Sequence, residues 1–415
     1  MTQPYDKITP EMQESYYQAS PYNLVRVILG KRFPADTASE NVYSRAAAAF
    51  QSWRQTGILK QDAQPSLYRY SQTFSVPGSQ STAERLGFIA LGRLEEYSAG
   101  VVFRHERTLA KPKADRLDLL RATRAHFGQI FMLYSGAGEV DALLDSVVAN
   151  ATPPDIEVCD EYGVVHRVWK VSHPAIIASL QEQMHDRKLI IADGHHRYET
   201  ALDFRRENVR QGARAEETFS PYDWVMMTFV DMDRPGLTIL PTHRVVFGLP
   251  ASALEHFSRE VRKFFSVEEI DPAIDAVRGA AILRQAGLAG TALLAVGGQR
   301  AFLLHTPKAV GSALFANLSL GQQALDVVQL HKCALEHCLR ISEQAILHQQ
   351  HVSYYREAGE ALAAVHSASA QMAFLMNPVH IEQVRDIAFA GEVLPQKSTD
   401  FYPKLLSGLA IYALE

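Results

Sequence analysis

The chain has 415 residues, of which 47% are hydrophobic and 21% are charged. This length predicts two or three domains with sizeable cores, and the composition is that of a globular protein without low-complexity tails. Forty-one lysines and arginines stand against 46 aspartates and glutamates, a net charge of −5 without a basic block, which argues against nonspecific nucleic-acid binding.

The first twenty residues contain no basic segment followed by an apolar run, so the sequence predicts no secretory signal. No run of about 18 apolar residues is present, which predicts that the protein does not span a membrane. Three cysteines, Cys159, Cys333 and Cys338, show no metal-binding spacing, and their odd number gives no disulfide framework. These features predict a cytoplasmic protein.

The first half of the chain predicts helices followed by a sheet. A helix is expected over residues 39–56, capped by Ser39 and ended by Gly57. Apolar and polar residues alternate on both sides of Pro77-Gly78, which predicts a hairpin. Beyond it we expect helices at 113–128 and 174–185 and strands at 131–136, 165–171, 189–192, 224–232 and 237–246.

Near Pro250 the pattern changes to alternating helices and short strands. We therefore predict two domains, residues 1–249 and 250–415, with an α/β (α+β) fold. In the second domain a longer helix is expected over 324–340, and a carboxy-terminal strand over 408–414.

The densest polar cluster is the run Asp193-Gly194-His195-His196-Arg197, between a buried strand and a helix. Gly194 permits a turn with positive φ, and the helix amino terminus favours a phosphate or carboxylate. Arg197 adds a planar pair of donors, and Asp193 is suited to hold a metal ion or accept a proton. A purely structural alternative has Asp193 capping the helix and Arg197 pairing with Glu199 or another surface carboxylate.

A second polar cluster precedes and begins the helix at 113–128. It mixes acids, bases and cations, as general acid–base catalysis beside an anionic substrate requires, although a solvated loop with surface ion pairs has the same composition. Its members are Glu95, Glu96, His105, Glu106, Thr108, Lys111, Lys113 and Arg116.

Two further segments carry polar groups. His243 and Arg244 follow the apolar run at 237–240. The segment 395–404 is rich in lysine and hydroxyl groups, as in a phosphate contact loop, but it lacks the glycine-rich cradle of a Walker motif. Because the polar motifs adjoin apolar strands that should share one sheet, we expect them to converge in one cleft, with the segment 397–404 folded over it.

Six motifs, in this order, resemble the uncharacterised bacterial and archaeal family with domain of unknown function 1015. They are Pro4-Tyr5-Asp6, Ser20-Pro21-Tyr22-Asn23, the His105–Arg116 region, Asp193 to Ala201, Leu240 to Arg244, and Pro395 to Lys404. The run 193–197 is also similar to the turn with which members of the ParB/sulfiredoxin-like superfamily bind nucleotide phosphates. One branch of that superfamily resembles free-serine kinases. The resemblance implies a ParB/sulfiredoxin-like mixed-sheet core and a phosphate-binding role for residues 194–197.

The sequence thus predicts an enzyme that binds a nucleotide (ATP, ADP or CTP), with Mg²⁺, or a phosphorylated metabolite. It would transfer or remove a phosphoryl group on a small hydroxyl compound such as serine. The catalytic candidates are Asp193, His195, His196, Glu106 and His105. The ligand-binding candidates are Gly194, Arg197, His243, Arg244, Lys397, Ser398, Thr399 and Lys404, and the metal-binding candidates are Asp193 and Glu95.

Two alternatives stay open. A ParB-type nucleotide-dependent regulator would need a DNA-reading module and a basic face, which the sequence does not show. A metal-dependent hydrolase using His105, His195 or His243 would lack a recognisable ligand spacing. The expected partner is a small phosphorylated molecule, with neither membrane nor nucleic acid, and the sequence does not predict the oligomeric state.

Overall fold

In the computed structural model the described residues are 1–106, 110–148, 153–210, 220–310 and 312–414. They divide into two compact units, each of which combines helices with a mixed or antiparallel sheet, so the predicted α/β class is confirmed. The first unit comprises Met1–Arg104, Thr108–Leu237 and Pro403–Glu415, and the second comprises His105–Arg107 and Thr238–Tyr402. The second unit thus begins ahead of the expected boundary at residue 250, and the carboxy-terminal residues return to the first.

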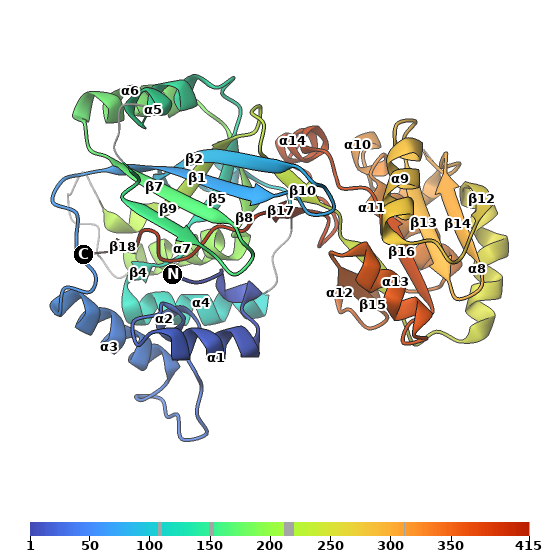
Figure 1. The fold of residues 1–415 in the computed structure, drawn as a ribbon, viewed down its shortest axis with the longest axis horizontal. Coiled ribbons are helices and arrows are strands. Elements are labelled where there is room, and N and C mark those ends of the chain that lie inside the picture. The colour runs from blue at the N-terminus through green and yellow to red at the C-terminus, as the bar shows by residue number, and fades with distance from the viewer. Residues whose placement is uncertain (107–109, 149–152, 211–219, 311, 415) are drawn as a thin grey trace. The chain divides into compact units, whose positions relative to one another are not determined.

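The first unit is built on an eight-stranded sheet in the order β3-β8-β5-β9-β2-β1-β7-β6 (Figure 1). β3 pairs with β8 and β5 with β9 in parallel, and the other neighbours are antiparallel. β1 and β2 form the hairpin predicted around Pro77-Gly78. The strands are β1 (Leu67–Ser75), β2 (Thr82–Arg93), β3 (Val102–Arg104), β5 (Ile130–Tyr134), β6 (Ile156–Cys159), β7 (Val165–Val171), β8 (Leu189–Asp193) and β9 (Trp224–Asp231).

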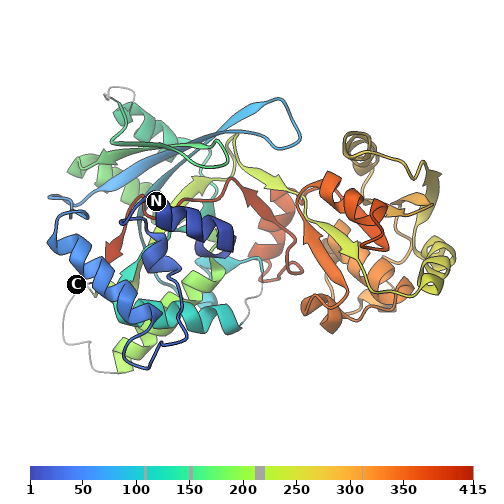
Figure 2. The ribbon, with the colours of Figure 1, turned by 60° about the horizontal axis from the view of Figure 1, so that its bottom comes forward.

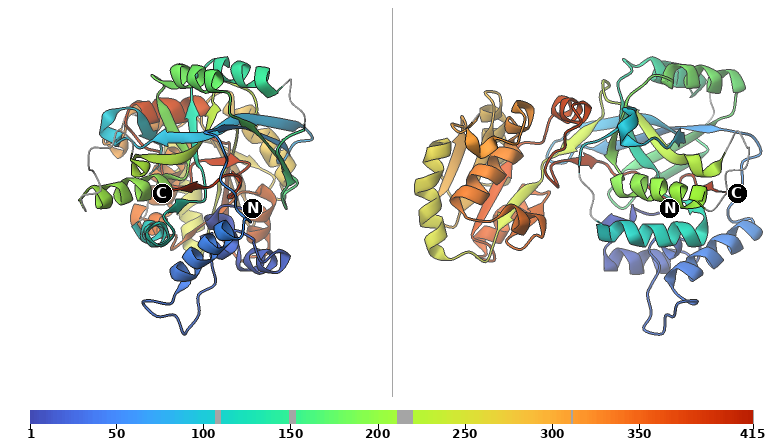
Figure 3. Two further views of the ribbon diagram at one scale, coloured as in Figure 1. Left: turned by 90° about the vertical axis from the view of Figure 1, so that its left-hand side faces the viewer. Right: turned by 180° about the vertical axis from the view of Figure 1, so that it is seen from behind.

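Helices cover both faces of this sheet (Figures 1 and 3). α5 (Glu139–Val148) and α6 (Pro174–Met184) lie on one face, and α7 (His195–Arg210) and α4 (Ala110–Thr123) lie on the other. Their apolar side chains and those of the strands form one buried cluster. Each large apolar side chain that is fully buried contributes about 1.5–3 kcal/mol, so this cluster is the main source of the unit's stability.

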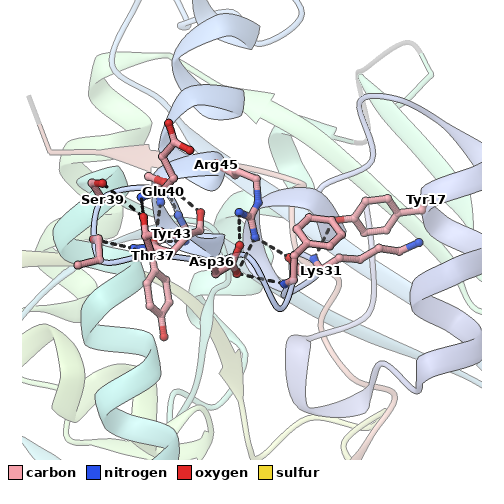
Figure 4. A network of polar contacts seen from close by, with 12 residues as sticks. Tyr17, Lys31, Asp36, Thr37, Ser39, Glu40, Tyr43 and Arg45 are labelled. Atoms are coloured by element: carbon pink, nitrogen blue, oxygen red, sulfur yellow. Dashed lines mark hydrogen bonds and ion pairs between the residues drawn. The ribbon is translucent and has the colours of Figure 1, made fainter.

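The amino-terminal helices form an outer layer against α4. They are α1 (Pro10–Ala19), α2 (Val25–Ile28) and α3 (Val42–Gln55). The expected helix at 39–56 is α3, but Asn41 rather than Ser39 caps it, in a reciprocal capping box with Ser44. Ahead of the cap, Arg45 holds the preceding loop through Asp36, with Nη1 and Oδ1 2.6 Å apart (Figure 4).

The two ends of the chain meet in the first unit. Thr2 N donates to Ser407 O at 3.1 Å, and Ser407 N donates to Thr2 O at 2.9 Å. Figure 2 shows the carboxy-terminal segment, in red, running past the amino terminus. Within the expected carboxy-terminal strand, β18 (Tyr412–Ala413) pairs with β4 (Ala125–His126), so this strand belongs to the first unit and not to the second.

The second unit contains a six-stranded sheet in the order β12-β14-β13-β16-β11-β15. Its two faces follow from strand alternation: Leu294 and Leu375 pack with α9 and α13, whereas Phe374 contacts Phe257 of α8. The strands are β11 (His243–Val246), β12 (Ser266–Ile270), β13 (Ala292–Gly297), β14 (Ala301–His305), β15 (Val352–Tyr355) and β16 (Met372–Met376). The helices are α8 (Ala251–Phe264), α9 (Ala276–Gly287), α10 (Leu320–Gln323), α11 (Asp326–Gln329), α12 (Glu343–Leu347), α13 (Ala358–His366) and α14 (Ile381–Phe389).

One expectation for this region was wrong. The apolar run 237–246 forms two strands instead of one: β10 (Thr238–Leu240) pairs with β17 (Asp400–Tyr402), and β11 pairs with β15 and β16. Pro241 separates them, because proline donates no hydrogen bond to a ladder. The expected helix at 324–340 is present, as α11 followed without a break by a π-helix, Leu330–Cys338. None of the helices in the described ranges is long and apolar enough to cross a bilayer.

Candidate functional site

The predicted strand, turn and helix around residue 193 are present in the first unit. Ile190 and Ile191 of β8 are fully buried. Asp193 is the last residue of β8, and His195 is the first residue of α7. Gly194 between them has φ +95°, a conformation that residues other than glycine rarely adopt. The strand therefore passes into the helix over a single residue, and the N–H groups of the first helical turn face the end of β8.

The guanidinium of Arg197 holds this turn closed. Its Nη2 donates to Asp193 Oδ2 at 3.0 Å, and its Nη1 donates to the carbonyl oxygen of Gln129 at 2.5 Å. A Cβ atom at Gly194 would lie 3.0 Å from Nη2, and one at Gly128 would lie 3.0 Å from Nη1. Both glycines therefore leave room for the guanidinium. The structural alternative from the sequence is correct that Arg197 pairs with a carboxylate, but the partner is Asp193.

Glu199, the other partner considered for Arg197, lies between two different cations. Its carboxylate is 3.8 Å from Arg104 Nη1 and 3.7 Å from Lys113 Nζ. Lys113 also pairs with Asp203, at 2.7 Å. Lys113, a member of the second polar cluster, thus contacts α7, and Thr108 of that cluster lies outside the described residues.

The two predicted metal ligands have separate cationic partners. Glu95 Oε1 lies 3.5 Å from Arg93 Nε, and the hydroxyl of Tyr198 fixes the Glu95 backbone by donating to its carbonyl oxygen at 2.7 Å. Asp193 pairs with Arg197. Across the described part of the chain, no group of three or more histidine, cysteine, aspartate or glutamate side chains is arranged to hold a metal ion.

Positive charge gathers around Asp193. Lys404 Nζ, from the far end of the sequence, lies 3.8 Å from Asp193 Oδ1. Burial acts to raise the pKa of Asp193, but the charges of Lys404, Arg197, His195 and Lys7 outweigh it and hold this pKa below its ordinary value. Three cations therefore act on one carboxylate at a helix amino terminus, where the helix dipole also favours negative charge.

The backbone of Lys404 is fixed by buried side chains of β1 and β2. Gln72 Nε2 donates to the carbonyl oxygen of Lys404 at 2.9 Å, and Arg85 Nη2 donates to that of Pro403 at 2.5 Å. Arg85 Nε also donates to Gln72 Oε1, at 3.0 Å. Burial lowers the pKa of Arg85 to about 10, so the guanidinium remains charged at neutral pH. Sequence analysis missed Gln72, Arg85 and Lys7, because only long-range packing brings them to the turn.

The remaining candidates lie in the second unit, where several contact one another. His105 Nε2 and Thr399 Oγ1 are 2.8 Å apart, and Leu394 N donates to His105 O at 2.8 Å. Ser398 Oγ donates to Pro395 O at 2.5 Å. The structure therefore joins the His105 region to the carboxy-terminal loop.

Arg244 holds the same loop from within the second unit. It is fully buried, and its Nη2 donates to the carbonyl oxygens of Lys397 at 3.0 Å and Gln396 at 3.4 Å. Its guanidinium lies 5.2 Å from the ring centroid of Tyr354, and burial lowers its pKa to about 10 although the charge of Glu106 acts to raise it. His243 accepts from Met376 N at 3.3 Å, and burial lowers its pKa to about 4. These contacts support a structural role for Arg244 and His243.

The predicted site residues thus belong to two groups. Asp193, Gly194, His195, His196, Arg197, Glu95 and Lys404 lie in the first unit, and His105, Glu106, His243, Arg244, Lys397, Ser398 and Thr399 lie in the second. The expectation that the strands adjoining the motifs all share one sheet was wrong. β3 and β8 do share a sheet, but β11 belongs to the six-stranded sheet. The reason is that sheet membership depends on pairing between distant segments, which local patterns do not encode.

The fold and this turn define an α/β protein with a cluster of cationic side chains at a strand-to-helix junction. The sequence model of the family described as "Protein of unknown function (DUF1015)" matches residues 1–328. The chain therefore belongs to this family, as its six motifs predicted. A comparison with curated proteins found no match.

Similar solved structures have low sequence identity and TM-scores below 0.5. A conserved hypothetical protein from Pyrococcus furiosus is 13% identical, with a TM-score of 0.37, over 77% of this chain and 93% of that one. A free serine kinase in complex with AMP is 13% identical, with a TM-score of 0.35, over 77% and 91%. SbnI with a C-terminal truncation, from Staphylococcus aureus, is 12% identical, with a TM-score of 0.37, over 77% and 85%. Likenesses at this level assign neither a ligand nor an activity to the present chain.

Proposed function

We propose that the protein binds a phosphate-bearing small molecule, a nucleotide or a phosphorylated metabolite, at the turn between β8 and α7. The observation that carries the proposal is the set of cations at this helix amino terminus, where Arg197, Lys404 and Lys7 all act on Asp193. A phosphate is favoured at such a position by the first-turn N–H groups, by the helix dipole and by the lysine charges.

Each residue then has a distinct part in binding. Lys404 Nζ is 3.8 Å from Asp193 Oδ1, so its charge lies close to the position that a phosphate would take at the turn. Arg197 already donates from both Nη atoms to groups of the protein, and it keeps the turn in shape. In this proposal Lys404 and Lys7 supply positive charge near the ligand, and Arg197 supplies the geometry.

We propose further that the protein is an enzyme of phosphoryl transfer on a small hydroxyl compound. This chemistry requires positioning and charge neutralisation more than covalent catalysis, and the turn offers both. His195 and His196, in the first turn of α7, are the proton-transfer candidates nearest to such a phosphate. Because Asp193 and Glu95 each face other cations, we assign no step to Mg²⁺ held by these two carboxylates.

The test compares ligand binding by two lysine variants. In Lys404→Met the site loses a partly buried cation, whereas the control Lys60→Met loses an exposed one. Inorganic phosphate, ATP, ADP and CTP should raise the melting temperature of the wild type and of the control. Loss of a charge-assisted hydrogen bond costs about 1.5–3 kcal/mol, so calorimetry should show roughly ten- to 150-fold weaker binding by Lys404→Met.

Two results would contradict phosphate binding at the turn. If no phosphate-bearing compound binds the wild type, or if Lys404→Met binds as tightly as Lys60→Met, the turn is structural.

If binding is found, phosphorus NMR of ATP mixed with serine and related hydroxyl compounds decides the activity. Retention of ATP without ADP formation would leave a binding protein and refute phosphoryl transfer with those acceptors. CTP binding accompanied by DNA retention would instead support a regulator of the ParB type.

A further inference from the structure

A small cavity lies in the first unit, on the side of Arg197 that faces α4. Its volume is about 70 Å³, and the residues around it include Tyr5, Arg116, Phe127, Gly128, Arg197 and Thr200. An apolar cavity of about 150 Å³ accepts benzene, with its six carbon atoms. By this measure the cavity has room for a group of roughly three non-hydrogen atoms, about the size of a carboxylate, and its open side leaves space for the rest of a ligand, such as the methyl group of acetate.

The cavity contains a polar group that the protein does not satisfy. Thr200 is only 3% exposed, and no atom in the described part of the chain forms a hydrogen bond with its Oγ1. A threonine inside a helix usually donates to the carbonyl oxygen four residues earlier, but this hydroxyl does not. Since buried hydroxyl groups nearly always have a partner, Thr200 points to an occupant of the cavity.

Two guanidinium groups border the same space. Arg197 and Thr200 are three residues apart on α7 and therefore share one face of that helix. Arg116, on α4, donates through Nη1 to Ile28 O at 2.7 Å and through Nε to Asp115 Oδ2 at 2.9 Å, and its guanidinium lies 4.2 Å from the centroid of the Tyr5 ring. Burial raises the pKa of Tyr5, and the charges of Arg197 and Arg116 oppose this rise, so both cations act on the cavity wall.

We propose that this cavity is a binding site for a small carboxylate, with the hydroxyl of Thr200 donating to one of its oxygens and Arg116 and Arg197 balancing its charge. The size of the cavity, the unsatisfied hydroxyl and the pair of arginines all fit this planar anionic group. The site shares Arg197 with the turn, but it does not depend on phosphate binding there. The ligand is thus either a small carboxylic acid or the carboxylate end of a larger metabolite.

The experiment uses acetate as the probe and two substitutions of Thr200. Thr200→Val removes the hydroxyl and keeps the shape, and Thr200→Ser keeps the hydroxyl. Saturation-transfer NMR of the acetate methyl group should show binding to the wild type and to Thr200→Ser, with a dissociation constant on the order of millimolar for so small a ligand. In Thr200→Val we expect about tenfold weaker binding, while the thermal shift produced by inorganic phosphate is unchanged.

Neutral acetamide has the shape of acetate, so comparing the two compounds shows whether binding requires the negative charge. Sodium chloride is added to the acetamide samples so that both series have the same ionic strength. Acetamide should bind at least tenfold more weakly than acetate to the wild type. The proposal is overturned if acetate does not bind, if Thr200→Val binds it as well as the wild type, or if acetamide matches it. The first two results indicate a cavity that holds water alone. Because phosphate is measured on the same variants, failure of this site is distinguishable from failure of the phosphate site.

Discussion

Replacement of Gly194 by alanine tests whether the β8–α7 turn has the geometry on which the functional proposal depends. The backbone at Gly194 has φ +95°, and placing an L-residue in a left-handed conformation costs about 1–2 kcal/mol. The new methyl group would also lie 3.0 Å from Arg197 Nη2 and 3.1 Å from its Cζ and Nε. Displacing that guanidinium weakens its hydrogen bond to the carbonyl oxygen of Gln129, and a hydrogen bond to a charged group contributes about 1.5–3 kcal/mol.

The two effects together predict that Gly194→Ala lowers the free energy of unfolding of the first unit by about 2–4 kcal/mol. Urea unfolding followed by circular dichroism measures this change. Gly163→Ala is the control for backbone strain alone, because its φ is +74° and no atom lies within 4 Å of the added methyl group. Gly128→Ala is the control for contact alone, with its methyl group 3.0 Å from Arg197 Nη1. If Gly194→Ala is no less stable than Gly163→Ala, the guanidinium does not brace the turn and the reasoning fails.

Two other predictions concern buried charges. Arg69 and Asp141 form an ion pair in which both side chains are 1% exposed. Arg69→Met should lower the free energy of unfolding by about 3 kcal/mol, at the low end for such pairs because Arg234 remains 3.4 Å from Asp141. Chemical denaturation should show the double variant Arg69→Met, Asp141→Leu to be more stable than the single variant. Burial raises the pKa of Asp326 to about 7, whereas in the unfolded chain an aspartate has a pKa of about 4. The folded protein therefore favours the protonated carboxyl. The stability that this gives is complete below about pH 4 and is lost as the pH rises to about 7. Asp326→Asn should therefore match the wild type at pH 4 and exceed its unfolding free energy by about 2–4 kcal/mol at pH 7.5, and equal pH profiles would contradict this sign.

The sequence predicted those parts of the fold that local patterns determine. β8, the glycine turn and α7 follow from a short apolar run, a residue that tolerates positive φ and a helical segment, all within neighbouring residues. The β1–β2 hairpin is equally local. The partners of these elements are not local: β11 resembles a strand of the first sheet, and only its pairing with β15 and β16 places it in the second.

The same distinction explains which site residues were found. Lys404 was included because its segment is rich in lysine and hydroxyl groups, but its contact with Asp193 depends on Gln72 and Arg85, which hold its backbone. Neither residue is part of a recognisable motif. Thr200 also has no distinguishing sequence pattern, because a threonine on a helix next to a polar motif is ordinary until its hydroxyl is seen to be buried without a partner.

The position of Arg197 determines which experiment is informative about function. An arginine at a helix amino terminus suggests a bidentate phosphate ligand, but here one Nη atom donates to Asp193 and the other to Gln129. A phosphate could take both donors only if the protein gave up both bonds and left the Asp193 carboxylate with one fewer cation. Loss of binding in an Arg197 variant would therefore reflect a deformed turn as much as a missing ligand contact. Lys404 has the opposite properties, since its charge is close to Asp193 and its removal leaves the hydrogen bonds of Arg197 intact, so it is the residue that separates ligand binding from folding.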